Sequence, residues 1–396
     1  MLEILIEDHF LRWPPALLIE ELDKLINYNL PNWGNFAETL LDDAFEDGSM
    51  FELFESITSR VQFSEVGKPW ENNGKESTES LQVSLLREVK SLSHEFPQSS
   101  QLPILFTFRN TATPIESTDP SFEALLNELN ATLQNLRNRG YFEKVFGPDC
   151  IDREEEGVSF DDINMKHSGS GLTWPLDIRY YDAFGRDFLY NALEIFDYYV
   201  AAPTQRSWHG FGEPHWDFYR FSRRRGRAVY RWEINRILSK HKSRYEMATE
   251  GANAGQIVER TAPQMADLIT SVTTETRDND DAQKVSHAFD LFQKREIDSE
   301  SKRSACITLA AVLENRRYLL KENLLTKDEG ALFQLANEFH IRHNNERQKR
   351  DYDSAFLEWV FWWYIATIDL SNKLIKQQEV VIEANQSEDS GTEPPF

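Results

Sequence analysis

The 396-residue sequence contains only two cysteines, Cys150 and Cys306. They lie far apart and match no paired or metal-binding spacing, so the sequence indicates neither a disulfide framework nor a zinc ribbon. The sequence also lacks a Walker loop, a nucleotide-binding glycine fingerprint and a nucleophile elbow. These absences argue against an ATPase, a dehydrogenase or an esterase. We expect a protein of a reducing compartment that uses no cofactor.

Long apolar runs are missing as well. The best candidate, residues 360–366, has seven apolar residues, whereas a membrane-spanning helix needs about twenty. The first residues, MLEILIEDHFLRWPP, lack the basic region and the small-residue cleavage site of a secretory signal. We therefore expect a cytoplasmic protein that does not contact a membrane.

Positive charge is scarce overall but concentrated in one segment. The formal net charge of −23 argues against nonspecific binding of nucleic acid by the whole surface. Residues 219–245, by contrast, hold ten Lys and Arg against one acid, Glu233. Aromatic residues alternate with these arginines, a mixture that suits nucleic acid because guanidinium groups bind phosphates and aromatic faces stack on bases. The arginines predicted to bind nucleic acid are Arg220, Arg223, Arg224, Arg225, Arg227 and Arg231.

The same basic segment has a simpler interpretation. Its aromatic side chains would then belong to the core, and its arginines would neutralise acids elsewhere in the chain. The sequence supplies 66 Asp and Glu for such pairing. Both interpretations stay open at the level of sequence.

Apolar periodicity predicts a mainly α protein of several units, with a few short strands and a carboxy-terminal bundle of four helices. Short strands are expected at residues 102–108 and 176–181, a small hairpin at 245–259, and a loop at 202–216. The four bundle helices are expected at 281–294, 302–323, 328 to about 343, and 354–378. The expected units are an amino-terminal helical region at 1–146, a middle α/β region with the basic segment at 176–262, the helical bundle at 281–384, and a disordered tail at 387–396.

A dense polar cluster precedes the most apolar helix of the chain. Apolar positions on the helix before it run Leu332, Leu335 and Phe339, and the next position on that face is Arg342. A guanidinium at the rim of a bundle interior needs a carboxylate or phosphate partner. In one interpretation Arg342 is a structural clamp that pairs with nearby acids, namely Asp351, Asp353 or Glu358.

In the functional interpretation the cluster performs phosphodiester chemistry. Arg342 would stabilise negative charge, and His340 or His343 would act as acid or base, because histidine titrates near neutral pH. Three further polar residues would orient the substrate: Asn344, Asn345 and Gln348. The two histidines complete no recognised metal-ligand motif with the nearby acids, so we predict no metal at this cluster.

A second pair of histidines, His209 and His215, flanks a Gly- and Pro-bearing loop. With Glu213 or Asp217 they could bind a metal ion. A solvated loop is the interpretation that this composition favours.

Three runs of the sequence resemble an uncharacterised family of bacterial proteins. They are GYFEKVFGPDCID, INRILSKHKSRYEMATEGANAGQIVE and LFQLANEFHIRHNNERQKRDYDSAFLEWVFWWYIATI, which carry signatures written GYF, DC.D, IRH, Q..YD and W.F..YLATI. The similarity covers about residues 125–374 and is most specific in the last run. It bears on architecture more than on activity.

The carboxy-terminal part also resembles, more remotely, the HEPN superfamily. These helical bundles often act as metal-independent ribonucleases in toxin, abortive-infection and antiviral systems. Their hallmark is an Arg, a polar residue after it, and a His about four to six positions beyond the Arg. Arg342 and His343 match the first two positions, but Arg347 or Gln348 stands where the last His is expected.

The HEPN resemblance implies a defence- or toxin-type protein that forms a homodimer through its bundle and handles RNA. If it is an enzyme, it is a metal-independent endoribonuclease in which His340 or His343 has taken over proton transfer. The competing hypothesis is a non-catalytic interaction protein that uses the same bundle for docking or dimerisation. That hypothesis explains the absent histidine more simply.

Overall fold

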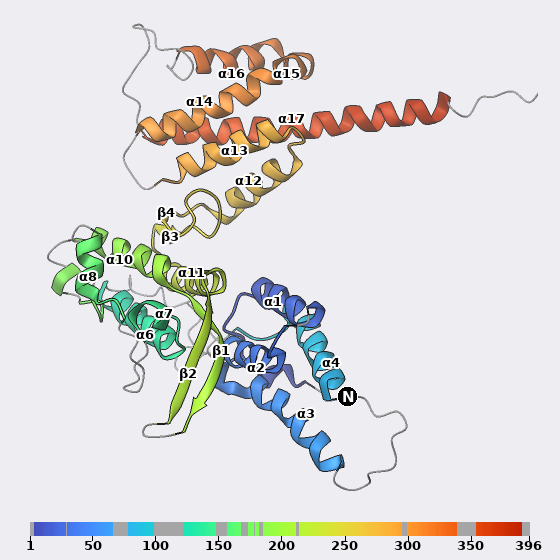
Figure 1. The fold of residues 1–396 in the computed structure, drawn as a ribbon. Coiled ribbons are helices and arrows are strands. Elements are labelled where there is room, and N and C mark those ends of the chain that lie inside the picture. The colour runs from blue at the N-terminus through green and yellow to red at the C-terminus, as the bar shows by residue number, and fades with distance from the viewer. Residues whose placement is uncertain are drawn as a thin grey trace, which may run out of the picture. The chain divides into compact units, whose positions relative to one another are not determined.

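In the computed structural model the chain forms two compact units, Met1–Ser243 and Arg244–Phe396, referred to below as the first and second units. The fold is mainly α, as predicted, and its described strands form two small antiparallel two-stranded sheets (Figure 1). The structure describes residues 4–28, 30–65, 78–98, 122–147, 157–167, 173–177, 179–181, 185–210, 214–294, 299–338 and 354–389.

The first unit begins with helices that pack on one another through their apolar faces. Helix α1 starts at a proline, which suits the first helical position because its missing N–H needs no partner there. Leu18 and Leu22 of α1 and Leu40 of α2 are fully buried. The elements are η1 (Ile6–Asp8), α1 (Pro15–Asn27), α2 (Trp33–Ala44), η2 (Glu46–Gly48), α3 (Ser49–Glu65) and α4 (Thr78–Ser91).

The rest of the first unit is built around α11, which packs against α6 and α10. Helix α6 ends at Asn138, shortly before Gly140, which has a φ of +79°. A Cβ at Gly140 would lie 2.5 Å from the ring of Phe218, so both the backbone conformation and the close approach require glycine. The helices are α6 (Phe122–Asn138), α7 (Glu143–Phe146), α8 (Phe160–Lys166), α10 (Arg186–Tyr199) and α11 (Arg223–Lys240).

The predicted loop at 202–216 was wrong, because these residues form most of a long hairpin. Strands β1 (Ala202–His209) and β2 (His215–Ser222) pair antiparallel, with Ala202 opposite Ser222 and His209 opposite His215. Proline is tolerated on edge strands, and both strands of a two-stranded sheet are edges, so Pro203 does not prevent pairing. The short strand predicted at 176–181 was also wrong, since residues 179–181 are helical.

The second unit opens with the small hairpin predicted from the sequence, β3 (Tyr245–Met247) paired with β4 (Ile257–Glu259). Its helices pack around an apolar core in which the rings of Phe292 and Phe361 stack with centroids 3.9 Å apart. The helices are α12 (Pro263–Glu275), α13 (Asn279–Phe292), α14 (Ser299–Asn315), α15 (Arg317–Asn323), α16 (Thr326–Glu338) and α17 (Ser354–Asp389).

The four bundle helices predicted from the sequence correspond to α13, to α14 with α15, to α16 and to α17. The second prediction, 302–323, is divided at Arg316, where the backbone leaves the helical conformation. In Figure 1, α13, α14 and α17 run side by side, in agreement with their packing contacts. Among the described residues, no helix is long and apolar enough to span a membrane.

The contacts divide the chain once, at a point inside the expected middle region. The chain divides between Ser243 and Arg244, so the expected middle region 176–262 contributes its helices and long hairpin to the first unit and its small hairpin to the second. Helix α17 runs to Asp389 and includes the first residues of the expected tail. The remaining tail residues and the strand expected at 102–108 lie outside the described residues. The finer subdivision stays a prediction.

Candidate functional sites

The polar cluster predicted to be catalytic lies in residues 339–353, outside the described residues. These residues join the end of α16 to the start of α17, and both helices belong to the apolar bundle. Leu332 of α16 is buried in the core, as the apolar pattern predicts. The roles given to the cluster, whether clamp or catalytic site, stay predictions. The residues concerned are His340, Arg342, His343, Asn344, Asn345, Gln348, Asp351 and Asp353.

The basic segment folds as strand β2 followed by α11, and two of its arginines reach α1. Glu21 accepts hydrogen bonds from Arg224, at 2.5 Å, and from Arg225, at 2.6 Å. Glu21 and Arg225 are both buried. Burial alone would raise the pKa of the Glu21 carboxyl, but the adjacent Arg225 and Lys24 outweigh it and bring this pKa to about 2. The ion pair of Arg225 with Glu21 therefore joins α11 to α1, about 200 residues earlier in the chain.

Two further arginines of the segment reach α10. Arg231 binds both carboxylate oxygens of Asp197, at 2.7 and 2.8 Å, and Arg227 donates to the Asp197 carbonyl at 3.0 Å. Four of the six predicted arginines thus have structural partners within the first unit, as the simpler interpretation expects. Arg220, Arg223 and Arg224 have exposed side chains. Contact between this segment and nucleic acid stays a prediction.

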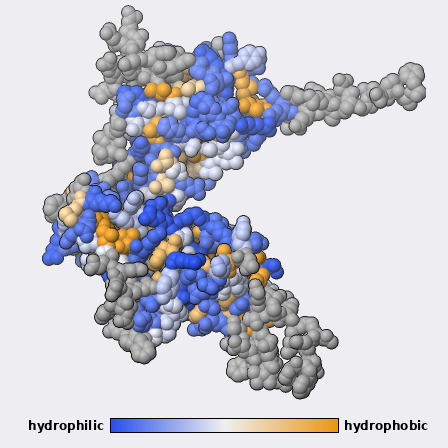
Figure 2. All heavy atoms as spheres, in the orientation of Figure 1, coloured by the Kyte–Doolittle hydropathy of each residue, from blue (hydrophilic) through white to orange (hydrophobic). Residues whose placement is uncertain are grey.

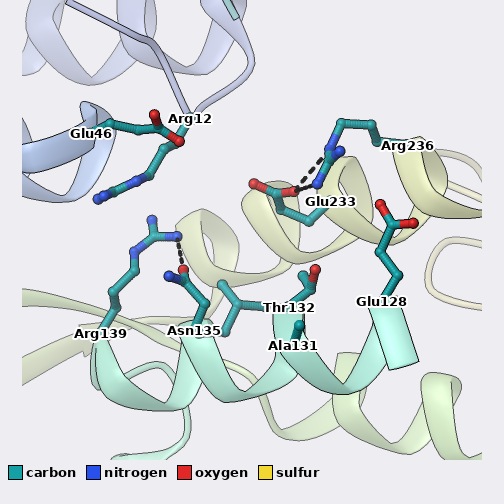
Figure 3. A pocket seen from close by; sticks show the side chains of 10 residues that line it. Arg12, Glu46, Glu128, Ala131, Thr132, Asn135, Arg139, Glu233 and Arg236 are labelled. Carbon is teal, nitrogen blue, oxygen red and sulfur yellow. Dashed lines mark hydrogen bonds and ion pairs between the residues drawn. The ribbon is translucent and has the colours of Figure 1, made fainter. Parts of the chain in front are cut away.

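A polar hollow of about 250 Å³ lies in the first unit (Figure 3). The guanidinium groups of Arg12 and Arg139 face the same space, and α6 supplies Asn135 beside them. Arg139 is held by Asp43, whose Oδ1 lies 2.7 Å from its Nε. The residues that line the hollow are Arg12, Glu46, Glu128, Ala131, Thr132, Asn135, Leu136, Arg139, Glu233 and Arg236.

The positive and negative side chains that line the hollow are equal in number. Burial and the neighbouring charge of Arg139 both lower the pKa of Arg12, an environment in which an anion would be stabilised. Three arginines nevertheless face three glutamates along the lining. The hollow is therefore not a cationic trap, and we assign it no ligand. No local motif could have revealed it, because its residues come from four separate parts of the sequence.

Helix α17 carries an apolar row in which Trp359, Ala366 and Leu370 are exposed, while Phe356 and Trp363 are partly buried against the bundle core. Its members follow one another at spacings of three and four residues, the heptad spacing of helices that pair. Trp359 is 54 % exposed, and its ring stacks on that of Trp363 with centroids 5.5 Å apart. The opposite side of the helix, including Phe361 and Ile365, is buried in the bundle. The α17 row consists of Phe356, Trp359, Trp363, Ala366 and Leu370.

Two groups of potential metal ligands occur within the described ranges. The first, Asp278 with Asp280 and Asp281, is explained by helix capping, since Asp278 accepts hydrogen bonds from the backbone N–H groups of the other two. Asp281 also pairs with Arg316. The second group, His209, His215 and Asp217, lies on the long hairpin of the first unit.

Comparison with known proteins finds no match to this chain among family models, curated proteins or solved structures. The resemblances drawn from sequence runs therefore stay predictions. Any function has to be argued from the residues themselves.

Proposed function

We propose that this protein is an RNA-associated helical protein that pairs with a second copy through the α17 row. The observation that supports this proposal is the partly exposed apolar row of α17, which has heptad spacing and begins directly after residues 339–353. That range contains the residues for which phosphate chemistry is predicted, Arg342 and His343 above all. Pairing and RNA handling would then involve neighbouring parts of the chain.

The heptad spacing of the α17 row favours a second copy of the chain as its partner. A row of apolar side chains that fits heptad packing is complementary to itself, which is what a two-fold contact requires. Aromatic side chains cover about 150–250 Å² each when fully buried. The bundle already covers part of these side chains, so two copies of the row would bury less than about 1,000 Å², the size of a weak interface. We therefore expect a dimer that dissociates on dilution.

Pairing at the α17 row would bring two copies of residues 339–353 into one region. Seven residues separate Ser354 from the midpoint of Trp359 and Trp363, which corresponds to about 10 Å along a helix. If the two-fold axis passes through that midpoint, the Ser354 residues of the two copies lie within about 20 Å of each other. In this arrangement Arg342 would bind a phosphate and His343 or His340 would transfer protons. Asn344, Asn345 and Gln348 would orient the RNA.

The first test is the mass of the full-length protein in solution over a range of concentrations. We expect the wild type to rise from 46.2 kDa toward twice that mass, and the double variant Trp359→Ser, Trp363→Ser to stay monomeric. Tyr318→Ser is the matched control, because Tyr318 is 76 % exposed on α15 and lies outside the α17 row. A wild type that stays monomeric throughout, or a control that dissociates like the double variant, contradicts the pairing.

The second test is RNA cleavage in the presence of a metal chelator. Arg342→Ala should abolish cleavage because it removes the predicted phosphate ligand, whereas Arg350→Ala removes the same charge from a position given no role. Unchanged cleavage in Arg342→Ala would remove this residue from the mechanism. Both variants should be compared at a protein concentration where the wild type is dimeric.

The second candidate function is interaction without RNA chemistry. The ion pairs of Arg224 and Arg225 with Glu21, and of Arg231 with Asp197, favour it, because they occupy arginines that RNA binding would need. A salt titration of RNA binding separates the two candidates. Phosphate contacts make affinity fall steeply as salt rises, whereas pairing of two chains of charge −23 should strengthen as salt screens their repulsion. Absence of RNA binding at low salt favours the interaction protein.

A further inference from the structure

The register of the long hairpin brings together three side chains that the sequence keeps apart. His209 ends β1 and lies directly opposite His215, the first residue of β2. Asp217 follows two residues later on β2, so its side chain is on the same face of the ribbon. All three side chains are partly buried. The hairpin thus holds two imidazoles and one carboxylate on one face, next to its turn.

The distances within this group match the edges of a metal coordination shell. Asp217 Oδ2 lies 3.4 Å from His209 Nδ1, and Asp217 Oδ1 lies 3.6 Å from His215 Nε2. Ligands about 2.0–2.2 Å from a tetrahedral zinc ion are roughly 3.3–3.6 Å apart. Both distances are longer than the usual hydrogen bond of about 2.9 Å. The ligand atoms of all three residues lie within 4.8 Å of one another.

The two imidazole rings lie face to face across the hairpin. They stack with centroids 4.8 Å apart and planes inclined by 15°. An imidazole nitrogen binds a metal ion in the plane of its ring, so a shared ion requires at least one of these nearly parallel rings to rotate about its side-chain bonds. The strands themselves are held in register by the pairs that follow, including a hydrogen bond of 2.8 Å between Ser207 Oγ and Tyr219 Oη.

We propose that His209, His215 and Asp217 bind a divalent transition-metal ion, with Zn²⁺ as the ion that this donor set fits best. Imidazole ligands select zinc and its neighbours over Mg²⁺ and Ca²⁺, which prefer oxygen donors. Three protein ligands leave one position of a tetrahedral shell for water or for a ligand from outside. Because its ligands come from both strands next to the turn, the bound ion holds the two strands together at the turn end of the hairpin. The site is independent of the function proposed for the second unit.

The test is a titration of the full-length, chelator-treated protein with Co²⁺, which reports a tetrahedral site by its visible absorption, followed by displacement with Zn²⁺. We expect about one ion per chain. Asp217→Asn keeps the size of the side chain and removes the charged ligand, so the affinity should fall by at least about tenfold. His209→Gln is a second variant of the same kind. Binding should weaken as pH falls, because protons compete for the imidazoles.

His287→Ala provides the control, because His287 is exposed on α13 and far along the chain from the hairpin. It should bind like the wild type, and circular dichroism should show that every variant is folded. If a variant fails to fold, the Co²⁺ absorption spectrum of the wild type still shows whether the protein binds the ion in a tetrahedral site. A wild type that develops no tetrahedral Co²⁺ absorption, or folded Asp217→Asn and His209→Gln variants that bind as tightly as the wild type, would overturn the proposal.

Discussion

Buried ion pairs occur in both units, but they join segments that are separated by different lengths of chain. In the first unit, buried ion pairs join segments that are far apart in sequence, such as Arg139 with Asp43 and Arg225 with Glu21. In the second unit the rings of Phe292 and Phe361 stack within the apolar core, and the buried ion pair of Arg316 with Asp281 joins the start of α15 to α13, only 35 residues away in sequence. Figure 2 shows that the visible surface of both units is mostly hydrophilic. The units therefore differ less in their surfaces than in how far along the chain their buried ion pairs reach.

Buried charge makes the first unit sensitive to single substitutions. Removing one partner of a buried ion pair leaves the other charge without compensation, which costs about 3–5 kcal/mol. Apolar contacts in a bundle respond more gradually, because each lost methyl group removes only about one kcal/mol. Substitutions at buried charges should therefore have the largest effects, and substitutions at exposed charges the smallest.

Asp43→Ala should be the most destabilising change. Asp43 accepts hydrogen bonds from Arg139 and from the buried hydroxyl of Tyr141, at 2.7 Å each. Its loss should lower the free energy of unfolding of the first unit by about 3–5 kcal/mol. Amide hydrogen exchange resolved by peptide measures this, since protection should fall in the first unit and not in the second. Equal loss of protection in both units would contradict the division between them.

Lowering the pH should destabilise the first unit through Glu21. The pKa of this carboxyl is about 2 in the folded chain against an ordinary 4.5, so its contribution is complete above about pH 4.5 and is lost as pH falls toward 2. The shift corresponds to on the order of 3 kcal/mol. Unfolding measured against pH should therefore be steeper in the wild type than in Glu21→Gln. Identical pH profiles would show that Glu21 does not supply the dependence.

Ile365→Val should test the apolar interior of the second unit. Ile365 is fully buried in the bundle core, and loss of one methylene there should cost about 0.5–1.5 kcal/mol. Because no charge is involved, the change should be the same at pH 4 and pH 7. Urea unfolding at the two pH values measures it, and a change that grows at low pH would argue against an apolar core at this position.

Arg224→Ala should have the smallest effect and provides a comparison with Arg225. Both arginines bind Glu21, but the side chain of Arg224 is 53 % exposed and that of Arg225 is 6 % exposed. Exposed ion pairs contribute about 0–1 kcal/mol, so Arg224→Ala should cost less than about 1 kcal/mol and Arg225→Ala several times more. Urea denaturation of the two variants measures the difference. Equal losses would show that burial does not set the strength of these pairs.

The four bundle helices were predictable from the sequence, because each buries one apolar face, whereas α8 and α12 were not among the predicted elements. Leu18 and Leu22 of α1 and Ile365 of α17 follow helical spacing and lie in the cores. The long hairpin was missed because its glycine and prolines are residues typical of loops. Pro203 is nevertheless tolerated on an edge strand, and Gly210 and Pro214 belong only to the turn. Strand pairing depends on the partner strand, which no local pattern records.

The candidate sites were predictable only in part. The sequence drew attention to His209 and His215, but only the register of the hairpin places them opposite one another with Asp217 beside them. It also offered both interpretations of the basic segment, and the choice depends on Glu21 and Asp197, which lie in other helices. The polar hollow could not be predicted at all, since Arg12 and Arg139 meet only in the folded chain.

The pairing of two chains through the α17 row is most directly tested by cross-linking at Ala366→Cys in a Cys150→Ser background. The native Cys306 should stay unreactive, because burial raises the pKa of its thiol to about 12. With a short bismaleimide we predict a covalent dimer for Ala366→Cys and none for Ala331→Cys, an exposed position on α16. Equal cross-linking at the two positions, or none at Ala366→Cys under conditions where dimers form, would contradict the account.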